Sequence, residues 1–297
     1  MTGWREIRGE ARRRANVRIR RAAGLEGDPP PLCSDPAEAY GDVYGVARVV
    51  HGDLASMLIG GVASLYFQML HPYAMAGVAQ FSRYQEDPLG RLLQTANFIS
   101  ATTYGSRSRA RTAITKVQNV HRRIHGVADD GVAYDANDPH LLTWVHCAEI
   151  AMFLEGYRRY GRHRLSDDDG DHYVYEMARL ARDVGVSNPP ESVAQLREAL
   201  LAFRGELRLS ADGAVARDFL ARGEMMRTRT QRRAYRIIER AARGLLDPWA
   251  RELLGEPRTP RRERLTVPSA RLLCRLMRLA VPPPQLNRVR PPSTTTT

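Results

Sequence analysis

Apolar residues recur along most of this chain at intervals of three and four positions. This spacing places them on one face of an α-helix, whereas the alternation that is typical of β-strands is scarce. Because helical periods dominate, the sequence predicts an all-α fold. The predicted helices cover residues 53–70, 72–82, 87–104, 107–125, 138–162, 168–185, 191–208, 212–223, 228–244, 246–255 and 268–280.

Several predicted helices have recognisable ends. Asp87-Pro88 and Asp138-Pro139 each combine a residue that accepts hydrogen bonds from the first turn with a proline suited to the first helical position. Glycines stand where helices commonly end, at Gly105, Gly126, Gly161 and Gly185. We predict one multi-helix domain over residues 38–285, preceded by a basic extension (1–37) and followed by a frayed tail (286–297).

One long uncharged segment allows two interpretations. No Asp, Glu, Lys or Arg occurs from Leu54 to Ser82, and the run LASMLIGGVASLYFQML is about long enough to cross a bilayer. However, it contains Gly60-Gly61, two serines and a glutamine, and it ends at His71-Pro72. A buried core helix is therefore favoured over a transmembrane helix.

The net charge of +12 raises the question of an anionic partner. Arginines crowd the segment REIRGEARRRANVRIRR, but Lys116 is the only lysine, which indicates a compositional habit as much as a phosphate-binding surface. The three isolated cysteines, Cys33, Cys147 and Cys274, form no disulfide framework or CxxC motif. Together with the absence of a secretory h-region, they lead us to expect a cytoplasmic protein.

Candidate chemistry begins with a histidine on an apolar stripe. In the helix predicted over 107–125, the inward positions are Ala110, Ile114, Val117, His121 and Ile124. His121 therefore points where apolar side chains point, whereas His125 is expected at the exposed helix end. From this helix alone, a core histidine bonded to the backbone is the more ordinary interpretation, and a metal ligand is the alternative.

The preceding helix strengthens the alternative. Arg91 and Thr95 lie one turn apart on one face, and Phe98 continues the same line. An arginine directed inward needs an acceptor. That acceptor is either a carboxylate of the chain, with Asp53, Asp87 and Glu149 as possible partners, or an anionic cofactor.

Two more histidines, His71 and His146, also occupy apolar surroundings, and His146 and Glu149 are spaced to meet on one helix. Common metal and phosphate motifs are absent, including Glu-x-x-His, HExxH, the EF-hand and the P-loop. Asp167, Asp168 and Asp169 fit the acidic first turn of a helix better than a metal loop. A haem remains compatible, since it needs one histidine, an arginine for a propionate and an apolar pocket.

Several motifs together resemble a known family. The segments LIGGVASLYFQMLHPYAMAGVAQFSRYQEDPLGRLLQTANFISATTYG, VQNVHRRIHG and DPHLLTWVHCAEI, with the closing GLLDPWARELLG and PPPQLNRVRPP, are similar to the MpaB/rubber oxygenase catalytic domain of bacterial proteins. The resemblance spans about residues 40–290. It implies an all-α fold around one non-covalent b-type haem.

The resemblance also implies roles for individual residues. His121 matches the histidine that binds the haem iron, and Arg91 and Thr95 match residues that line the haem pocket, where Phe98 and His146 are also expected. His71 is expected in the catalytic site. Gln94 stands where rubber oxygenases have a lysine that closes the distal iron position, and their catalytic glutamate has no counterpart that we can locate.

The sequence thus predicts a haem-dependent oxygenase or oxidase. We expect it to act on a small, unsaturated, apolar metabolite rather than on polyisoprene, with dioxygen or peroxide as the oxidant. The alternative is a basic helical module that binds nucleic acid or an anionic membrane without catalysis. Specific nucleic-acid recognition is not expected, because the chain has no helix-turn-helix spacing and no aromatic-interleaved basic patch.

Overall fold

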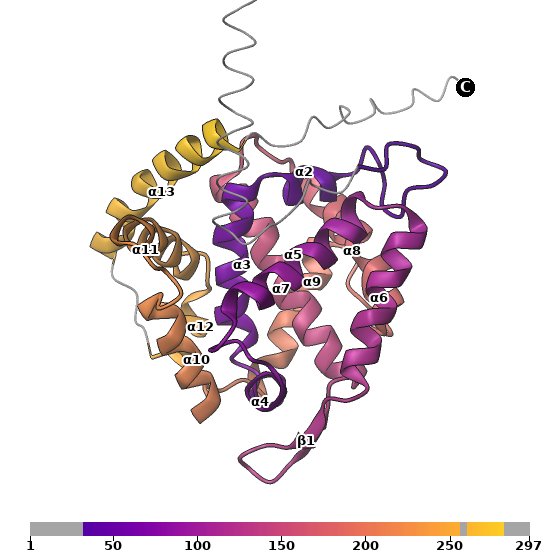
Figure 1. Cartoon of the computed structure of the whole chain (residues 1–297), viewed down its shortest axis with the longest axis vertical. Helices are drawn as coiled ribbons and strands as arrows, with labels where there is room; N and C mark the ends of the chain where they lie inside the picture. The colour runs from indigo at the N-terminus through magenta and orange to yellow at the C-terminus, as the bar shows by residue number, and fades with distance from the viewer. Residues whose placement is uncertain (1–31, 256–259, 282–297) are drawn as a thin grey trace, which may run out of the picture.

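The computed structural model describes residues 32–255 and 260–281, and over these ranges the chain is a bundle of α-helices with one small hairpin (Figure 1). The predicted all-α fold is confirmed. The helices are α2 (Val46–Gly52), α3 (Leu54–Gln68), α4 (Pro72–Phe81), α5 (Pro88–Tyr104), α6 (Arg107–His121), α7 (Pro139–Tyr160), α8 (Asp167–Val184), α9 (Val193–Ala202), the 3-10 helix η1 (Phe203–Gly205), α10 (Ala211–Arg222), α11 (Arg229–Arg243), α12 (Pro248–Leu253) and α13 (Pro260–Ala280).

Helices α3 and α7 pack along each other and form the centre of the core. Two glycines make their close approach possible. A Cβ atom at Gly60 would lie 2.7 Å from the backbone oxygen of Met152, and one at Gly156 would lie 3.0 Å from the Cα of Gly60. Any larger side chain at these positions would push the two backbones apart.

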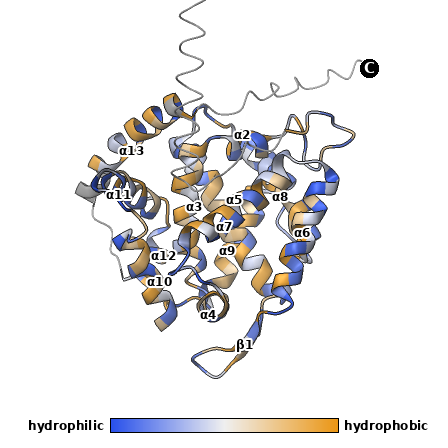
Figure 2. Ribbon diagram, viewed as in Figure 1, coloured by the Kyte–Doolittle hydropathy of each residue, from blue (hydrophilic) through white to orange (hydrophobic). Residues whose placement is uncertain are grey.

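The uncharged run that begins at Leu54 is the core helix α3. Much of it is coloured as hydrophobic in Figure 2, in contrast to the hydrophilic α11, and large side chains such as Tyr66 and Phe67 are fully buried. Among the described helices, none is by itself long and apolar enough to cross a membrane. The bent pair α2 and α3, which turns by 89°, has the necessary length and composition only when both are counted.

The predicted helix starts are confirmed by their hydrogen bonds. The carboxylate of Asp87 accepts from the amide of Gly90 at 2.9 Å, and that of Asp138 accepts from the amide of His140 at 2.9 Å. The acidic run after Ser166 forms the first turn of α8, where Ser166 and Asp169 cap each other reciprocally.

The helix predicted over 107–125 is too long, because the chain leaves the helix at His121. His125 begins a strand, β1 (His125–Val127), which pairs antiparallel with β2 (Ala133–Asp135). The turn between them is built by Gly131, whose φ is 81°, and by Asp130, which accepts a hydrogen bond from the amide of Val132. His125 is therefore exposed as expected, but on a hairpin and not at a helix end.

Helix α2 was missed by the sequence analysis because its start is stabilised from a distant part of the chain. The carboxylate of Glu176 on α8 accepts hydrogen bonds from the amides of Val46 and Ala47 at 2.7 and 3.1 Å. A Cβ atom at Gly45 would collide with this carboxylate, so the residue before the helix must be small. No local capping residue marks such a start in the sequence.

The C-terminal helix is longer than predicted and is attached to the core by a buried ion pair. Helix α13 begins at Pro260 and continues through Pro268, and helix α9 ends at Ala202 instead of continuing to residue 208. The guanidinium of Arg278 contacts the buried carboxylate of Asp53 at 2.7 Å. Most of the predicted extension (1–37) and all of the predicted tail (286–297) lie outside the described residues.

Candidate functional site

Helices α5 and α6 form a helical hairpin, since only two residues join them. At the closed end of this hairpin, Phe98 packs against Ala110 and Ile114 in a small apolar cluster with Tyr40. The predicted line on α5 becomes more buried along its length: Arg91 and Thr95 are exposed, Phe98 is half-buried and Thr102 is buried. The N-terminal part of α5 therefore lies near solvent and its C-terminal part lies in the core. We call the solvent-facing end of the α5–α6 hairpin its open end.

The inward stripe on α6 becomes less buried along the chain, whereas the line on α5 becomes more buried. Ala110 and Ile114 are buried, whereas Val117 and His121 are half-buried. Because the chain reverses between the two helices, His121 lies toward the open end of the hairpin, and the charge of Arg91 acts on its ring. The structure therefore brings Arg91, Thr95 and His121 to one end of the α5–α6 hairpin, with Phe98 further inside.

The guanidinium of Arg91 has no hydrogen bond or ion pair with any residue that the structure describes. Desolvation lowers its pKa although solvent still reaches the side chain, a combination that indicates a partly enclosed position. None of the three carboxylates expected as partners pairs with it. Asp53 binds Arg278, Asp87 caps α5, and no ion pair joins Glu149 to Arg91. The guanidinium is thus available to an anion.

The ring of His121 also makes no hydrogen bond with a described residue. Desolvation lowers its pKa, the positive charge of Arg91 lowers it further, and Asp135 opposes these effects. The neutral imidazole is therefore favoured near pH 7, and a neutral imidazole with an unused nitrogen is the form that binds a metal ion. One turn from Arg91, the hydroxyl of Thr95 donates to the backbone oxygen of Arg91 at 3.2 Å, and the neighbouring Gln94 is exposed.

His146 and Glu149 lie one turn apart on α7, but no hydrogen bond joins them. The Nε2 atom of His146 is buried without a partner among the described residues, and burial lowers the pKa of this ring to about 4. Burial raises the pKa of Glu149 to about 7. A carboxyl with such a pKa exchanges protons readily near neutral pH. His146 shares no hydrogen bond or ion pair with Arg91 or His121.

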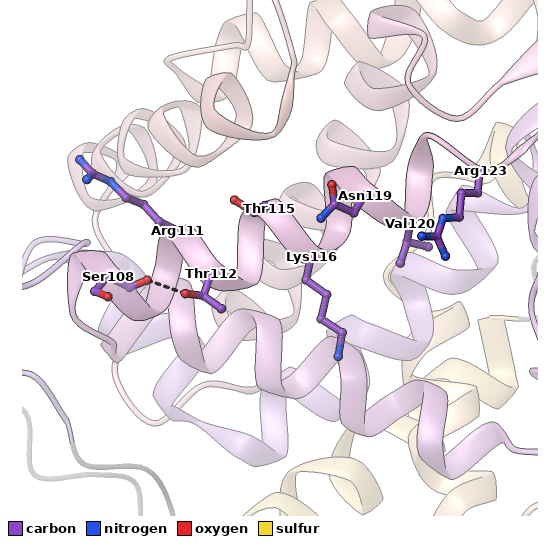
Figure 3. Close-up of a pocket in the computed structure, with 8 residues that line it drawn as sticks. All are labelled: Ser108, Arg111, Thr112, Thr115, Lys116, Asn119, Val120 and Arg123. Atoms are coloured by element: carbon purple, nitrogen blue, oxygen red, sulfur yellow. Dashed lines mark hydrogen bonds between the residues drawn. The ribbon is translucent and has the colours of Figure 1, made fainter.

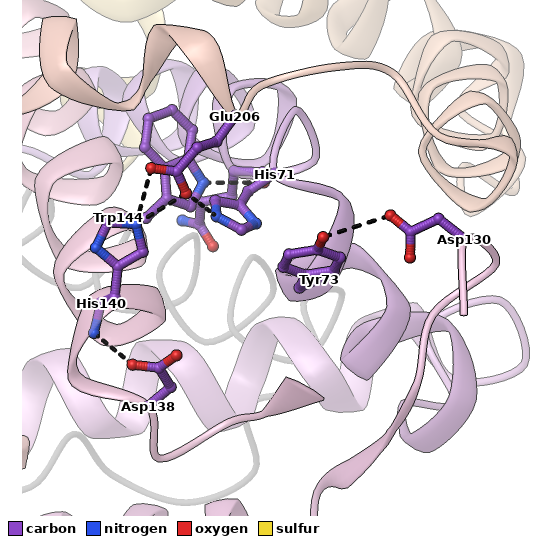
Figure 4. A network of polar contacts seen from close by, with 8 residues as sticks. His71, Tyr73, Asp130, Asp138, His140, Trp144 and Glu206 are labelled. Carbon is purple, nitrogen blue, oxygen red and sulfur yellow. Dashed lines mark hydrogen bonds and ion pairs between the residues drawn. The ribbon is translucent and has the colours of Figure 1, made fainter. Parts of the chain in front are cut away.

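The structure places His71 in a different cluster. Its Nε2 atom lies 3.7 Å from the carboxylate of Glu206, which in turn contacts the Nε2 atom of His140 at 2.8 Å (Figure 4). His140 and Glu206 were missed by the sequence analysis. His140 stands in the first turn of a predicted helix, where it resembled a surface residue, and Glu206 was placed inside a helix that in fact ends earlier.

The sequence analysis missed one further buried histidine, His51, whose two ring nitrogens both have hydrogen-bond partners. The Nδ1 atom of His51 lies 2.8 Å from the hydroxyl of Thr103, and its Nε2 atom lies 3.0 Å from the hydroxyl of Tyr173. Burial lowers the pKa of His51 to about 3, so the ring is neutral. With both nitrogens engaged, His51 connects α2, α5 and α8 and has no free atom for a ligand.

The opposite face of α6 carries a broad, open hollow of about 710 Å³ (Figure 3). Its lining includes Arg111, Lys116 and Arg123 together with hydroxyl and amide side chains. At about 100° per residue, Thr112 and Lys116 lie roughly 140–180° around the helix from His121, whereas Arg111 lies about 80° from it. Arg122 and Arg123, which follow His121, are exposed to solvent.

The family relationship follows from a comparison with family models. Residues 48–279 match the model described as "ER-bound oxygenase mpaB/B'/Rubber oxygenase, catalytic domain". The chain belongs to this family. No curated protein and no solved structure matches the chain. Membership of an oxygenase family indicates an oxidoreductase that uses oxygen and a small-molecule substrate.

The residues at the open end of the α5–α6 hairpin fit a haem by their chemistry. A b-type haem needs a neutral histidine nitrogen for its iron and a cation for its propionates. His121 offers the first, because its ring is unpartnered and its pKa is lowered. Arg91 offers the second, because its guanidinium lacks a carboxylate partner within the described residues. The unpartnered Nε2 atom of His146 is a further polar atom that a bound group or water could satisfy.

Proposed function

We propose that this protein is a haem b-dependent oxygenase in which His121 binds the iron. The observation that carries this proposal is the pairing of an unpartnered, desolvated Arg91 with an unpartnered, neutral His121 at one end of the α5–α6 hairpin. The guanidinium has no carboxylate partner and the imidazole has no hydrogen bond among the described residues. Together the two side chains can supply an anion-binding group and a metal ligand.

Each residue has a distinct task in this proposal. His121 donates a nitrogen lone pair, and Arg91 pairs with a carboxylate of the haem and raises the preference of His121 for its neutral form. Thr95 presents a hydroxyl one turn along the same face of α5, and Phe98 closes the inner end of the hairpin against Ala110. The haem, when bound, supplies the activation of oxygen.

The proposed substrate class is supported by apolar side chains on α5. Leu89 and Leu92 on α5 are 38% and 48% exposed, and such side chains favour an apolar molecule over a charged one. We propose a small, unsaturated, apolar substrate. Glu149, whose pKa is raised to about 7, is the group on α7 best suited to accept or return a proton during turnover.

The proposal is tested by the visible spectrum of the purified protein. Protein produced with a supply of haem should show a Soret band, and the pyridine haemochrome should give one haem b per chain. His121→Ala should lose the band. His125→Ala is the matched control, since this exposed histidine lies four residues further on, and it should retain haem as the wild type does.

Two results would overturn the assignment. A colourless wild-type protein, even with haem supplied during expression, would remove the basis for a haem enzyme. A Soret band that survives in His121→Ala but disappears in His146→Ala would move the iron ligand to α7. Arg91→Gln should retain the histidine ligand but bind haem at least about tenfold more weakly, because one propionate loses its charged partner.

The alternative of a basic binding module is favoured by one observation, the cationic hollow on the back of α6 (Figure 3). Binding of DNA or anionic vesicles that weakens steeply with salt, together with a protein that lacks haem, would support that alternative. Replacing Arg111 and Lys116 with glutamine should then abolish binding, whereas the haem proposal expects these changes to leave the Soret band unaltered.

A further inference from the structure

A second cluster of potential ligands lies at the N-terminal end of α7, separate from the proposed haem site. His71 comes from the segment between α3 and α4, His140 from the first turn of α7, and Glu206 from the residue after η1 (Figure 4). One ligand atom from each of these three side chains lies within 4.8 Å of the other two. Segments that are far apart in the sequence thus converge on one small volume.

The local structure fixes each of these side chains. Pro72 opens α4, so His71 immediately before it stays extended. Asp138 caps α7 and thereby orients the turn that carries His140. The amide of Arg208 donates to the backbone oxygen of Leu70 at 2.8 Å, which holds the segment of Glu206 against that of His71.

His71 is the unusual member of the cluster. Its side chain is 1% exposed, and neither ring nitrogen has a hydrogen-bond partner among the described residues. Its Nε2 atom faces Glu206 at 3.7 Å, which is too long for a hydrogen bond. An ion pair between His140 and Glu206 would account for those two residues alone. It would leave the buried ring of His71, aimed at the same carboxylate, without a function.

The spacing suits a small transition-metal ion. In a tetrahedral zinc site with bonds of about 2.0–2.2 Å, two ligand atoms lie roughly 3.3–3.5 Å apart. The distances of 3.7 Å and 2.8 Å from Glu206 to the two histidines bracket that separation. Small side-chain rotations would therefore place all three atoms around one ion.

The charges around the cluster are also compatible with a bound cation. Both ring nitrogens of His71 lack a hydrogen-bond partner among the described residues, so a lone pair is available to an ion. Arg208, whose positive charge acts on His71, is paired with Asp130. The side chains of His140 and Glu206 are 54% and 45% exposed, so one side of the cluster faces solvent. A water molecule can approach from that side as a fourth ligand.

We propose that His71, His140 and Glu206 bind a zinc-type divalent metal ion, with water as the fourth ligand. The ion joins α4, α7 and the segment after η1, and its binding stabilises the folded chain by an amount that grows with the logarithm of its concentration above the dissociation constant. This inference does not depend on the proposed haem function, because none of its ligands belongs to the α5–α6 hairpin.

The test uses the full chain, freed of metal with a chelator, and Co²⁺ as the spectroscopic probe of a zinc-type site. The wild type should bind one Co²⁺ per chain with the visible absorption of a tetrahedral ion. Zn²⁺ should displace the Co²⁺ and raise the melting temperature. His140→Ala and Glu206→Gln should each weaken Co²⁺ binding by more than about tenfold, since losing a direct ligand exceeds the loss of a supporting group.

Matched controls separate the site from surface effects. His172→Ala and Glu198→Gln remove exposed residues of the same types and should bind Co²⁺ like the wild type. His71 is buried, so the test rests on the two more exposed ligands, His140 and Glu206, whose replacement removes less buried packing. A wild type that binds no Co²⁺, or equal affinity in His140→Ala and Glu206→Gln, would overturn the proposal.

The outcome is also distinct from that of the haem experiment. Glu206→Gln should keep the Soret band, and His121→Ala should keep Co²⁺ binding. Loss of both signals in either variant would show that the two sites are not separate.

Discussion

The surroundings of His51 and His71 differ in a way that separates a structural histidine from a candidate ligand. Both rings are buried and both are neutral, because burial lowers their pKa values to about 3 and about 4. His51 has a hydroxyl on each nitrogen. His71 has a partner on neither among the described residues. Burial and pKa are similar, so the missing partners make the difference.

The same contrast holds for two arginines. Arg278 is bound to the buried carboxylate of Asp53 and attaches α13 to the start of α3. Arg91 is desolvated without any carboxylate among the described residues. Arg91 and His71 lie at the two proposed sites, whereas Arg278 and His51 belong to the framework that supports them.

This contrast predicts the largest loss of stability at the compensated ion pair. Asp53→Asn should lower the free energy of unfolding by about 3 kcal/mol, because the guanidinium of Arg278 would remain largely buried without an anion. Urea denaturation of the variant and the wild type measures the difference. A change below about 1 kcal/mol would mean that Arg278 finds solvent easily and that α13 is held mainly by apolar contacts.

A somewhat smaller loss is expected at the satisfied histidine. His51→Phe should cost about 2 kcal/mol, because the hydroxyls of Thr103 and Tyr173 would lose a buried partner. In metal-free protein, His71→Phe should cost less, since the ring of His71 makes no hydrogen bond that could be lost. Equal costs for the two substitutions, measured by urea denaturation in the presence of chelator, would contradict the distinction between the two histidines.

The sequence predicted the helical fold and the inward face of α6 because both depend on local periodicity. Arg91 and Thr95 on α5, which were expected to point inward, are exposed in the structure. The stripe that includes Ala110, Ile114 and His121 is a property of one helix, and the structure confirms that it becomes buried toward Phe98. Family membership, carried by several motifs in order, was also predictable. These features need no knowledge of which helices touch.

The remaining features depend on distant contacts. Helix α2 begins where Glu176 reaches its amides from α8, and the cluster of His71 and Glu206 exists only because Leu70 and Arg208 are hydrogen-bonded. The β-hairpin of β1 and β2 is stabilised by its turn and by its strand pairing. The sequence analysis missed it because the apolar spacing of α6 continues to Ile124. The pairing of Arg278 with Asp53 likewise joins distant segments, and no spacing in the sequence specifies it.

The buried carboxyl of Glu149 should make the stability of the folded chain depend on pH. Burial raises its pKa from an ordinary 4.5 to about 7, so the folded state holds a proton that the unfolded state releases. The folded chain therefore loses stability as the pH rises from about 4.5 to about 7. Glu149→Gln should remove this loss and be about 1–2 kcal/mol more stable than the wild type at pH 8, with no gain at pH 4.5.

The measurement is a series of urea denaturations across this pH range. Glu155→Gln, a change at a more exposed carboxylate on the same helix, is the control and should show no comparable gain at pH 8. An equal gain at pH 4.5 and pH 8 would mean that shape, and not ionisation, causes the effect, and that Glu149 does not hold a proton near neutral pH.

The smallest effect on stability is expected at Arg91, and this is the sharpest test of the contrast between the two arginines. In haem-free protein, Arg91→Gln should change the free energy of unfolding by less than about 0.5 kcal/mol, because no ion pair is broken. Arg278→Gln should cost several times more, because Asp53 would remain buried without its cation. When haem is bound, the difference in stability between the two proteins should become larger, since the wild type would then gain more stability than Arg91→Gln at the same haem concentration. If Arg91→Gln destabilises the haem-free protein as much as Arg278→Gln does, Arg91 belongs to the structural framework and the proposed propionate contact has no basis.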